Sequence, residues 1–549
     1  MKETGEKKTE KAQEKMYPWE KVDRNLESWE IARDFLEMRA KKQFELVSFK
    51  DIIERCADTA AAEWWEKVQP GYGSGLWCPI YYAISVAGGV RDAVVVIHGA
   101  QSCVTAVRHF FALYGGGGGG NYYWGSPFTF VVSTDLNERD NILGAPEKLK
   151  RTLLEVDEIH KPEIIFVAPT CGPGMIGEPI EEVIEDVKPD LKHAKECVYL
   201  DLPGFKAIDE GDMMREATTG YWTALMKEPK KKVKGAVNVI GDYRGTSWEE
   251  KDHFKTNFPT TFDEIGGILN ALGLKLHVTV PQSSLGDIRR APEAEFNIVN
   301  CPMLAYPICE EMEEKFGIPW SPHVYPLGKE GITNYIMAFA KHFRKEKEAQ
   351  ALIDEKWKEI EPLWEKAKKL IKGKTILMDS AISMTSVNRQ LGYARMLQEM
   401  GAKDIVFFNI MPSEILGRRE GVEYYLTTSA AGEPFNPQFL WWPAPHAIKL
   451  SPIEVADFLG LKDDEILHLY GDLGWYTKAP RWDSSNIAQV QSSIHFRRRR
   501  NVCQRSIFFS GTRGLLVDII NAVEGTKRKG NWSLYSRILG KWPVPAPTG

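Results

Sequence analysis

Among its 549 residues the sequence has no apolar run of about 18 residues, the length that a membrane-spanning helix needs. Residues 1–15 are polar and carry charges of both signs, so the apolar segment of a secretory signal is also missing. A net charge of −5 gives no general attraction to nucleic acid or to an anionic membrane. We therefore expect a cytoplasmic protein with no membrane or nucleic-acid partner.

The common nucleotide-binding loops are absent too. The six glycines at 115–120 are not followed by Lys-Ser or Lys-Thr, as a phosphate-binding loop requires. No Gly-x-Gly-x-x-Gly segment with a downstream acidic residue fits either. If the enzyme uses ATP, another subunit must bind it.

Cysteine is sparse, and no two cysteines form a Cys-x-x-Cys pair, which leaves a zinc ribbon or a thioredoxin-like motif unsupported. Disulfides are not expected in a cytosolic chain. The cysteines are therefore either buried core thiols or iron–sulfur ligands gathered from distant loops. The eight are Cys56, Cys78, Cys103, Cys171, Cys197, Cys301, Cys309 and Cys503. We interpret Cys56, Cys197 and Cys309 as core thiols.

Strand-like apolar runs alternate with amphipathic helices along the chain, the pattern typical of parallel α/β units. The runs lie at 93–97, 163–168, 235–243, 276–280, 375–378 and 404–408. The sequence therefore predicts an α/β protein with three doubly wound, Rossmann-like domains and parallel sheets.

We expect five segments in this order. They are an N-terminal arm with helices (1–74), an α/β domain with the first three clustered cysteines (75–232), an α/β domain carrying Cys301 (233–345), a charged connecting helix (346–373) and a C-terminal α/β domain (374–549).

Three cysteines lie beside turns that contain glycine or proline. Cys103 follows His98-Gly99 after one strand, Cys171 opens a glycine-rich turn after the next, and Cys78 precedes a proline. Three thiolates could converge from these loops, and soft thiolate ligands suit an iron–sulfur cluster. Three ligands are too few for a cubane, so the remaining ones would come from a partner chain.

Cys301 lies at the C-terminal end of a short apolar strand that begins at Phe296, and it precedes an acidic-basic helix and a second strand entry at 318–320. Ligands bind at the carboxyl ends of strands in α/β sheets. This stretch is therefore the second candidate site.

With their flanking residues, these motifs resemble nitrogenase component 1. The His-Gly-x-x-x-Cys motif ends at Cys103, Cys171 is followed by a Met-Ile-Gly turn, and the stretch from Cys301 to the Gly-Ile-Pro-Trp at 317–320 is similar to the α-type subunit. The resemblance implies a P-cluster-type iron–sulfur cluster (8Fe-7S or related), held by Cys78, Cys103 and Cys171 and shared with a β-type subunit.

The resemblance further implies that Cys301 holds a nitrogenase-cofactor-like iron–sulfur cluster, with the heterometal left open. Clusters would then lie between the domains and at the subunit interface of an α2β2 heterotetramer. An ATP-hydrolysing 4Fe-4S iron protein would be the electron donor.

The family's second cofactor ligand is a histidine in the last domain, and its position here stays open. Cys503 and His495 are nearly equal candidates, with His468 and His446 behind them. The four arginines at 497–500 form either a solvated or partner-binding face or an anion site for a cluster or a bound organic acid.

The chain departs from nitrogenase at the expected substrate face. Where the family has a glutamine and a histidine, counting from Gly204 places Glu210 and Met214. Phe111 stands near the place of a guarding arginine, and Val86 keeps an apolar wall. Such a site favours an apolar, polarizable substrate, and Glu210 could donate a proton if burial raises its pKa.

Because of this departure, the chain most resembles the nitrogenase-like methylthio-alkane reductases. The resemblance implies cleavage of C–S bonds in small thioethers. The alternatives are a true nitrogenase α subunit, which reduces dinitrogen to ammonia, and a non-catalytic scaffold on which the cofactor is assembled.

Overall fold

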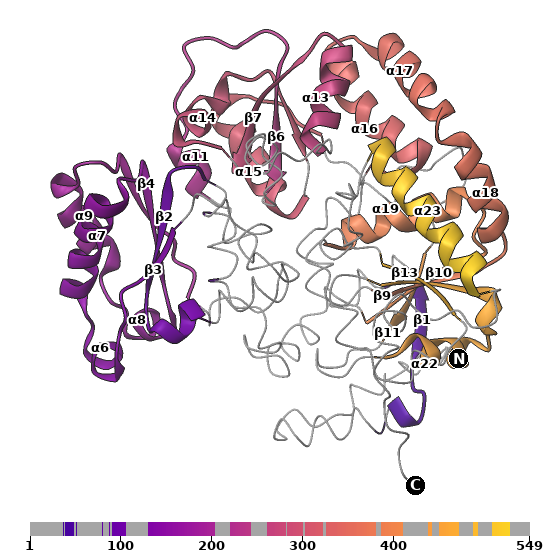
Figure 1. Ribbon diagram of the computed structural model, residues 1–549, viewed down its shortest axis with the longest axis horizontal. Helices are drawn as coiled ribbons and strands as arrows, with labels where there is room; N and C mark the ends of the chain where they lie inside the picture. The colour runs from indigo at the N-terminus through magenta and orange to yellow at the C-terminus, as the bar shows by residue number, and fades with distance from the viewer. Residues whose placement is uncertain are drawn as a thin grey trace, which may run out of the picture.

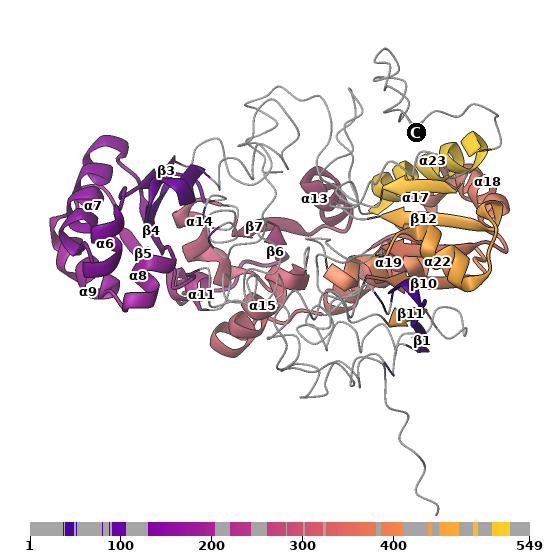
Figure 2. The same cartoon turned by 90° about the horizontal axis from the view of Figure 1, so that it is seen from below.

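The computed structural model describes residues 37, 39–48, 51, 80, 87, 90–105, 130–203, 220–242, 261–281, 283–299, 302–321, 326–379, 386–409, 437–441, 450–470, 487–491 and 508–526. These residues form three mainly parallel β-sheets with helices packed against them. The three sheets lie in a row, in the order in which the chain reaches their main strands (Figures 1 and 2). The predicted α/β fold with parallel sheets is confirmed.

The first sheet has the order β3-β2-β4-β5, and all its neighbours are parallel. Its strands are β2 (Ala93–His98), β3 (Phe130–Ser133), β4 (Ile164–Pro169) and β5 (Glu196–Tyr199). Successive side chains of β2 point to opposite faces. Val94 and Val96 pack toward α7 and α9, whereas Val95 and Ile97 pack in the core shared with the second sheet.

Four helices follow the strands of this unit. They are α6 (Glu138–Leu143), α7 (Pro146–His160), α8 (Cys171–Ile176) and α9 (Ile180–Val187). The apolar residues of α9 recur at helical spacing, so Ile180, Val183, Ile184 and Val187 are all buried. The sequence predicts only a turn at Cys171, but residues 171–176 form a short helix, α8.

The second sheet has the order β7-β6-β8 and is parallel. Its strands are β6 (Ala236–Asp242), β7 (Lys275–Pro281) and β8 (Phe296–Val299), and its helices are α11 (Tyr221–Leu225), α13 (Thr261–Ala271), α14 (Leu285–Arg290) and α15 (Pro302–Phe316). The buried amide of Asn238 donates to Asn297 Oδ1 at 2.9 Å and to the Ala291 carbonyl at 2.8 Å. This bond joins β6 to β8, the strand that leads toward position 301.

The third sheet has the order β1-β11-β10-β9-β12-β13. Its strands are β1 (Glu45–Ser48), β9 (Thr375–Asp379), β10 (Asp404–Phe408), β11 (Gln438–Trp441), β12 (Ile466–Tyr470) and β13 (Ala488–Gln491). β1 is antiparallel to β11, and the other pairs are parallel. The sequence pattern does not predict β1, because its four residues carry no clear alternation of apolar and polar side chains.

An ion pair strengthens the attachment of the N-terminal segment to this sheet. Arg39 donates from Nε to Glu454 Oε1 at 2.6 Å and from Nη2 to Oε2 at 2.7 Å. Glu454 also closes the capping box of α22 with Ser451. The N-terminal segment is therefore held by both backbone pairing and a two-pronged ion pair.

The remaining helices are α16 (Gly328–His342), α17 (Glu346–Lys358), α18 (Glu361–Ile371), α19 (Ser386–Glu399), α22 (Pro452–Leu459) and α23 (Phe508–Thr526). The sequence predicts one charged helix across 346–373, but the chain forms two, α17 and α18. Pro362 explains the break, because proline is tolerated in the first turn of a helix and not in its interior. Trp357 and Trp364 meet edge to face across the break.

The sheets share hydrophobic cores. One core combines Val95 and Ile97 of the first sheet with Ile240 and Val299 of the second. Another combines Val237 of the second sheet with Ile376 of the third, through the helices α16 to α19 and α23. Each sheet is thus packed against the next through apolar side chains, although the expected domain boundaries themselves stay predictions.

A buried charged cluster lies where α16 meets α19. Arg395 Nη2 is 2.9 Å from Glu330 Oε1, and their side chains are 7% and 18% exposed. A second carboxylate, Glu399, lies beside the start of α16, where a Cβ added to Gly328 would be 2.8 Å from Glu399 Oε2. Burial, and then repulsion from Glu330, raises the pKa of Glu399 to about 7. The cluster therefore holds a proton at mildly acidic pH that an unfolded chain would release.

We expect Glu399→Gln to stabilise the protein at about pH 8. The folded-state pKa of Glu399 lies above its unfolded value, so the wild type loses stability as the pH rises from about 4.5 through about 7. Glutamine keeps the shape and cannot ionise, and the gain in the free energy of unfolding is about 3 kcal/mol. Thermal and denaturant unfolding of both proteins at about pH 5 and pH 8 measure it.

Glu355→Gln serves as the matched control, because Glu355 is an exposed carboxylate on α17. This control should change stability little at either pH. Equal stability of wild type and Glu399→Gln at about pH 8 would mean that the cluster carries no such penalty.

Candidate functional site

Cys103 and Cys171 lie at the same edge of the first sheet. β2 and β4 are parallel and in register from Ala93 and Ile164 to His98 and Pro169, so both strands end together. Cys103 lies in a helical segment at 101–105 that follows β2, and Cys171 is the first residue of α8 after β4. The carboxyl edge of a parallel sheet is where α/β proteins bind ligands.

The two thiols are near enough to influence one another. Both cysteines are partly buried. Burial raises the pKa of Cys103, and the neighbouring Cys171 raises it further. Ser102 acts in the opposite direction through a hydrogen bond. The fold therefore brings together two of the three cysteines that the sequence analysis groups.

Glycine at position 99 lets the ends of β2 and β4 approach one another closely. A Cβ added to Gly99 would lie 2.0 Å from Thr170 Cγ2 and 2.6 Å from Thr170 Cβ, which is closer than real Cβ contacts allow. The backbone amide of Thr170 donates to the His98 carbonyl at 2.9 Å. Only a residue without a side chain fits between the ends of β2 and β4.

A second glycine lets α6 pack against α8. A Cβ added to Gly172 would lie 2.2 Å from Asn141 Oδ1. Asn141 is held in turn, because its Nδ2 donates to the Asn137 carbonyl at 2.9 Å. Asn137 and Asp140 form the capping box that starts α6. The α6 helix therefore lies directly beside the start of α8.

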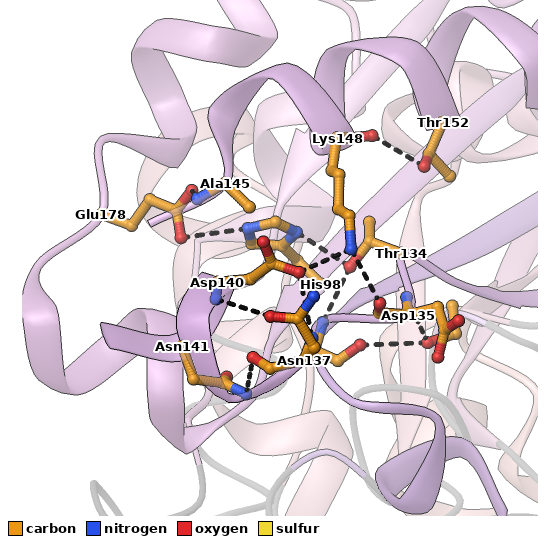
Figure 3. A network of polar contacts seen from close by, with 12 residues as sticks. His98, Thr134, Asp135, Asn137, Asp140, Asn141, Ala145, Lys148, Thr152 and Glu178 are labelled. Carbon is orange, nitrogen blue, oxygen red and sulfur yellow. Dashed lines mark hydrogen bonds and ion pairs between the residues drawn. The ribbon is translucent and has the colours of Figure 1, made fainter. Parts of the chain in front are cut away.

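A polar network joins these strand ends (Figure 3). His98 is fully buried, with Nδ1 at 3.1 Å from Thr134 Oγ1 and Nε2 at 3.1 Å from Glu178 Oε2. Lys148 Nζ lies 2.5 Å from Asp140 Oδ2 and also donates to the Asp135 carbonyl at 3.1 Å. Sequence reasoning identified His98 only as part of a motif and missed Glu178, which has no neighbouring sequence signal of a buried role.

The chain is described on both sides of position 301. β8 ends at Val299, whose carbonyl accepts from Tyr335 Oη at 2.9 Å, and α15 begins at Pro302. A parallel bridge pairs Asn297 with Trp320, so the predicted second strand entry is present. The approach to position 301 is thus fixed at the carboxyl edge of the second sheet.

Most of the other predicted site residues lie outside the described residues. They are Cys78, Val86, Phe111, Glu210, Met214, Cys301, His446, His495, Cys503 and the arginines at 497–500. Cys56 lies outside them as well. Their assignments stay predictions.

His468, a candidate second cofactor ligand, lies within β12. Its side chain is fully buried, and its ring centroid is 5.9 Å from that of Phe408. Burial lowers its pKa to about 3, which keeps the imidazole neutral. Cys309 and Cys197 are buried as well, which confirms their interpretation as core thiols.

The described residues contain no group of three or more His, Cys, Asp or Glu side chains arranged to hold a metal ion. Cys103 and Cys171 form a pair, and the third cysteine of the predicted set, Cys78, is not among the described residues. Across the same part of the chain, no helix is both long and apolar enough to cross a membrane.

Solved structures support the fold. A structure titled "Nitrogenase Cp1 at pH 5" superposes with a TM-score of 0.57, covering 81% of this chain and 88% of that one at 19% identity. A second structure, titled "Nitrogenase Cp1 at pH 6.5", superposes with a TM-score of 0.59. It covers 83% of this chain and 95% of that one at 15% identity.

Over the aligned residues, curated relatives are about a quarter identical to the chain. The nitrogenase molybdenum-iron protein alpha chain of Methanosarcina barkeri is 27% identical over 64% of this chain and 63% of its own length. The alpha chain of Clostridium pasteurianum is 27% identical over 58% of this chain and 57% of its own length. The nitrogenase iron-molybdenum cofactor biosynthesis protein NifE of Methanococcus maripaludis is 26% identical over 53% and 57%. The match spans about six tenths of the length of these relatives.

The resemblance to α-type component 1 chains is thereby confirmed. The family model described as "Nitrogenase component 1 type Oxidoreductase" matches residues 78–409, which is more than half of the chain and includes Cys78, Cys103, Cys171 and Cys301. The chain therefore belongs to the nitrogenase component 1 type oxidoreductase family.

Proposed function

We propose that this chain is the cofactor-bearing subunit of a nitrogenase-like iron–sulfur reductase. The observation that carries the proposal is the meeting of Cys103 and Cys171 at adjoining strand ends, within the region that the family model matches. Position 301 follows the end of β8 at the corresponding edge of the second sheet.

The donor set fits an iron–sulfur cluster. Two partly buried thiols at one sheet edge are soft ligands, which favour iron–sulfur clusters over hard cations. Burial disfavours the free thiolate of Cys103, and a bound metal would reverse this preference because a coordinated thiol is deprotonated. Cys78 would add a third ligand, and a β-type partner the rest. When bound, the cluster would supply one-electron storage at this edge.

The chain's own residues would shape a second site around Cys301. Tyr335 fixes the end of β8 through the Val299 carbonyl, and the amide of Asn238 fixes the same strand from β6. Cys503, His495 or His468 would provide a second ligand to a nitrogenase-cofactor-like cluster. The arginines at 497–500 would offer guanidinium groups to anions.

The substrate is proposed to be a small methylthio-alkane. Val86, Phe111 and Met214 would line an apolar, polarizable site, and Glu210 would donate the proton that the leaving carbon or sulfur atom requires. As the resemblance to nitrogenase component 1 implies, electrons would come from an ATP-dependent iron protein. The sequence has no phosphate-binding loop of its own, so that partner would bind the ATP.

Two other functions remain candidates. A true nitrogenase α subunit is favoured by the similarity to molybdenum-iron protein alpha chains. A cofactor-assembly scaffold is favoured by the similarity to the cofactor biosynthesis protein NifE. These alternatives differ in product and in whether the cofactor stays with the chain.

We expect Cys103→Ser and Cys171→Ser each to lower the iron content of the anaerobically purified complex by roughly half, because a cluster on Cys301 would remain. Cys309→Ser is the matched control, since Cys309 is a fully buried thiol within α15. Iron and acid-labile sulfide analysis measures the effect. An unchanged iron content in both strand-end variants would rule out the proposed interface cluster.

We expect the complex to release ethylene from 2-methylthioethanol when it is supplied with its iron protein, ATP and reductant. Headspace gas chromatography detects the product, and a parallel vial under dinitrogen is analysed for ammonia. Ammonia without ethylene would identify a nitrogenase. Neither product from a cluster-loaded sample would favour the assembly scaffold.

We expect Glu210→Gln to lower ethylene turnover by about 10² or more, because glutamine cannot donate the proton. The iron content should stay at the wild-type value. Unchanged turnover would exclude Glu210 from proton transfer.

A further inference from the structure

His98 and Glu178 connect the two segments that carry the cysteines. His98 is the last residue of β2, five residues before Cys103. Glu178 follows α8, seven residues after Cys171. The His98 Nε2 to Glu178 Oε2 distance is 3.1 Å, and the two side chains are 0% and 1% exposed. A direct link between the segments is therefore shielded from water.

Thr134 holds the other side of the His98 ring. Thr134 Oγ1 accepts from the backbone amide of Gly99 at 3.0 Å and lies 3.1 Å from His98 Nδ1 and 3.5 Å from the Ile97 carbonyl oxygen. On the Glu178 side, an ionised carboxylate can only accept, so the ring hydrogen that suits this contact lies on Nε2, facing Glu178.

Glu178 is held on its other side as well. Its Oε1 accepts from the backbone amide of Ala145 at 2.7 Å, at the start of α7. Its backbone amide donates to the Pro173 carbonyl within α8 at 3.1 Å. The carboxylate thus joins the end of β2, the start of α7 and the end of α8. Figure 3 shows Glu178 reaching both His98 and Ala145.

We propose that the His98–Glu178 contact is a positioning pair that sets the spacing between Cys103 and Cys171. The pair touches neither thiol in any described contact, and it acts by tying the segment after β2 to the segment after β4. The proposal deepens the proposed function and rests on it for its purpose, because a cluster requires ligands at a fixed separation.

The contact is suited to fix the position of the two segments, because removing either partner leaves the other as a buried polar group with fewer partners. Among the described residues, removing His98 would leave the buried carboxylate with the Ala145 amide as its one donor. Removing Glu178 would leave Nε2–H of His98 facing a cavity.

The test measures the thiol spacing in cluster-free protein of the full chain. Dibromobimane becomes fluorescent when it bridges two neighbouring thiols, and peptide mass mapping identifies the Cys103–Cys171 bridge. We expect His98→Leu to lower the yield of this bridge at least about fivefold. His98→Gln, which keeps a donor facing Glu178, should stay within about twofold of the wild type.

The double variant His98→Leu with Glu178→Leu separates positioning from stability. It removes the unpaired carboxylate, so its melting temperature should recover relative to His98→Leu. The bridge yield should stay low, because the tie is still missing. If the melting temperature and the bridge yield recovered together, the pair would have only a stability role, and the proposal would be overturned.

His160→Gln is the matched control, since His160 ends α7 at the opposite edge of the first sheet. It should leave the bridge unchanged. A wild-type bridge yield in His98→Leu would also overturn the proposal. If the wild-type complex binds no iron while the bridge yields follow the expected pattern, the proposed function fails and the positioning pair stands.

Discussion

The close approach of the ends of β2 and β4 is the constraint on which the candidate site depends. Gly99 lies against Thr170 with no room for a side chain, and a hydrogen bond between Thr170 and His98 closes the contact. Because both strands stop at this level, the segments that follow them begin side by side. The two cysteines meet through this backbone geometry, and the His98–Glu178 pair adds a second tie behind it.

The packing between the sheets fixes the position of this sheet edge. Val95 and Ile97 of β2 contribute to a core that continues into β6 and β8, while Val94 and Val96 face their own helices. The strand that ends near Cys103 and the strand that leads toward position 301 are therefore buried in one apolar cluster. A change in the packing of either sheet would be felt at both strand ends, since close-packed interiors transmit strain.

The sequence was most informative where strands are fully buried. The runs at β2, β4, β9 and β10 were predicted within a residue or two, because buried parallel strands read as continuous apolar segments. It was less informative where tertiary contacts decide the outcome. β1 pairs with β11, and the buried Glu178 side chain contacts His98 and the Ala145 amide. No local pattern records such distant partners, and most of the predicted ligands lie outside the described residues.

The pairing of β1 with β11 bears on how the chain can fold during synthesis. Residues 45–48 leave the ribosome early, but their partners at 438–441 are made nearly four hundred residues later. The carboxylate that receives Arg39 lies later still, at position 454. The first two sheets draw their strands from consecutive stretches and can form as they emerge, since units fold in order of synthesis. The third sheet cannot gain its outer strand until most of the polypeptide exists, so the early segment has to stay available throughout translation.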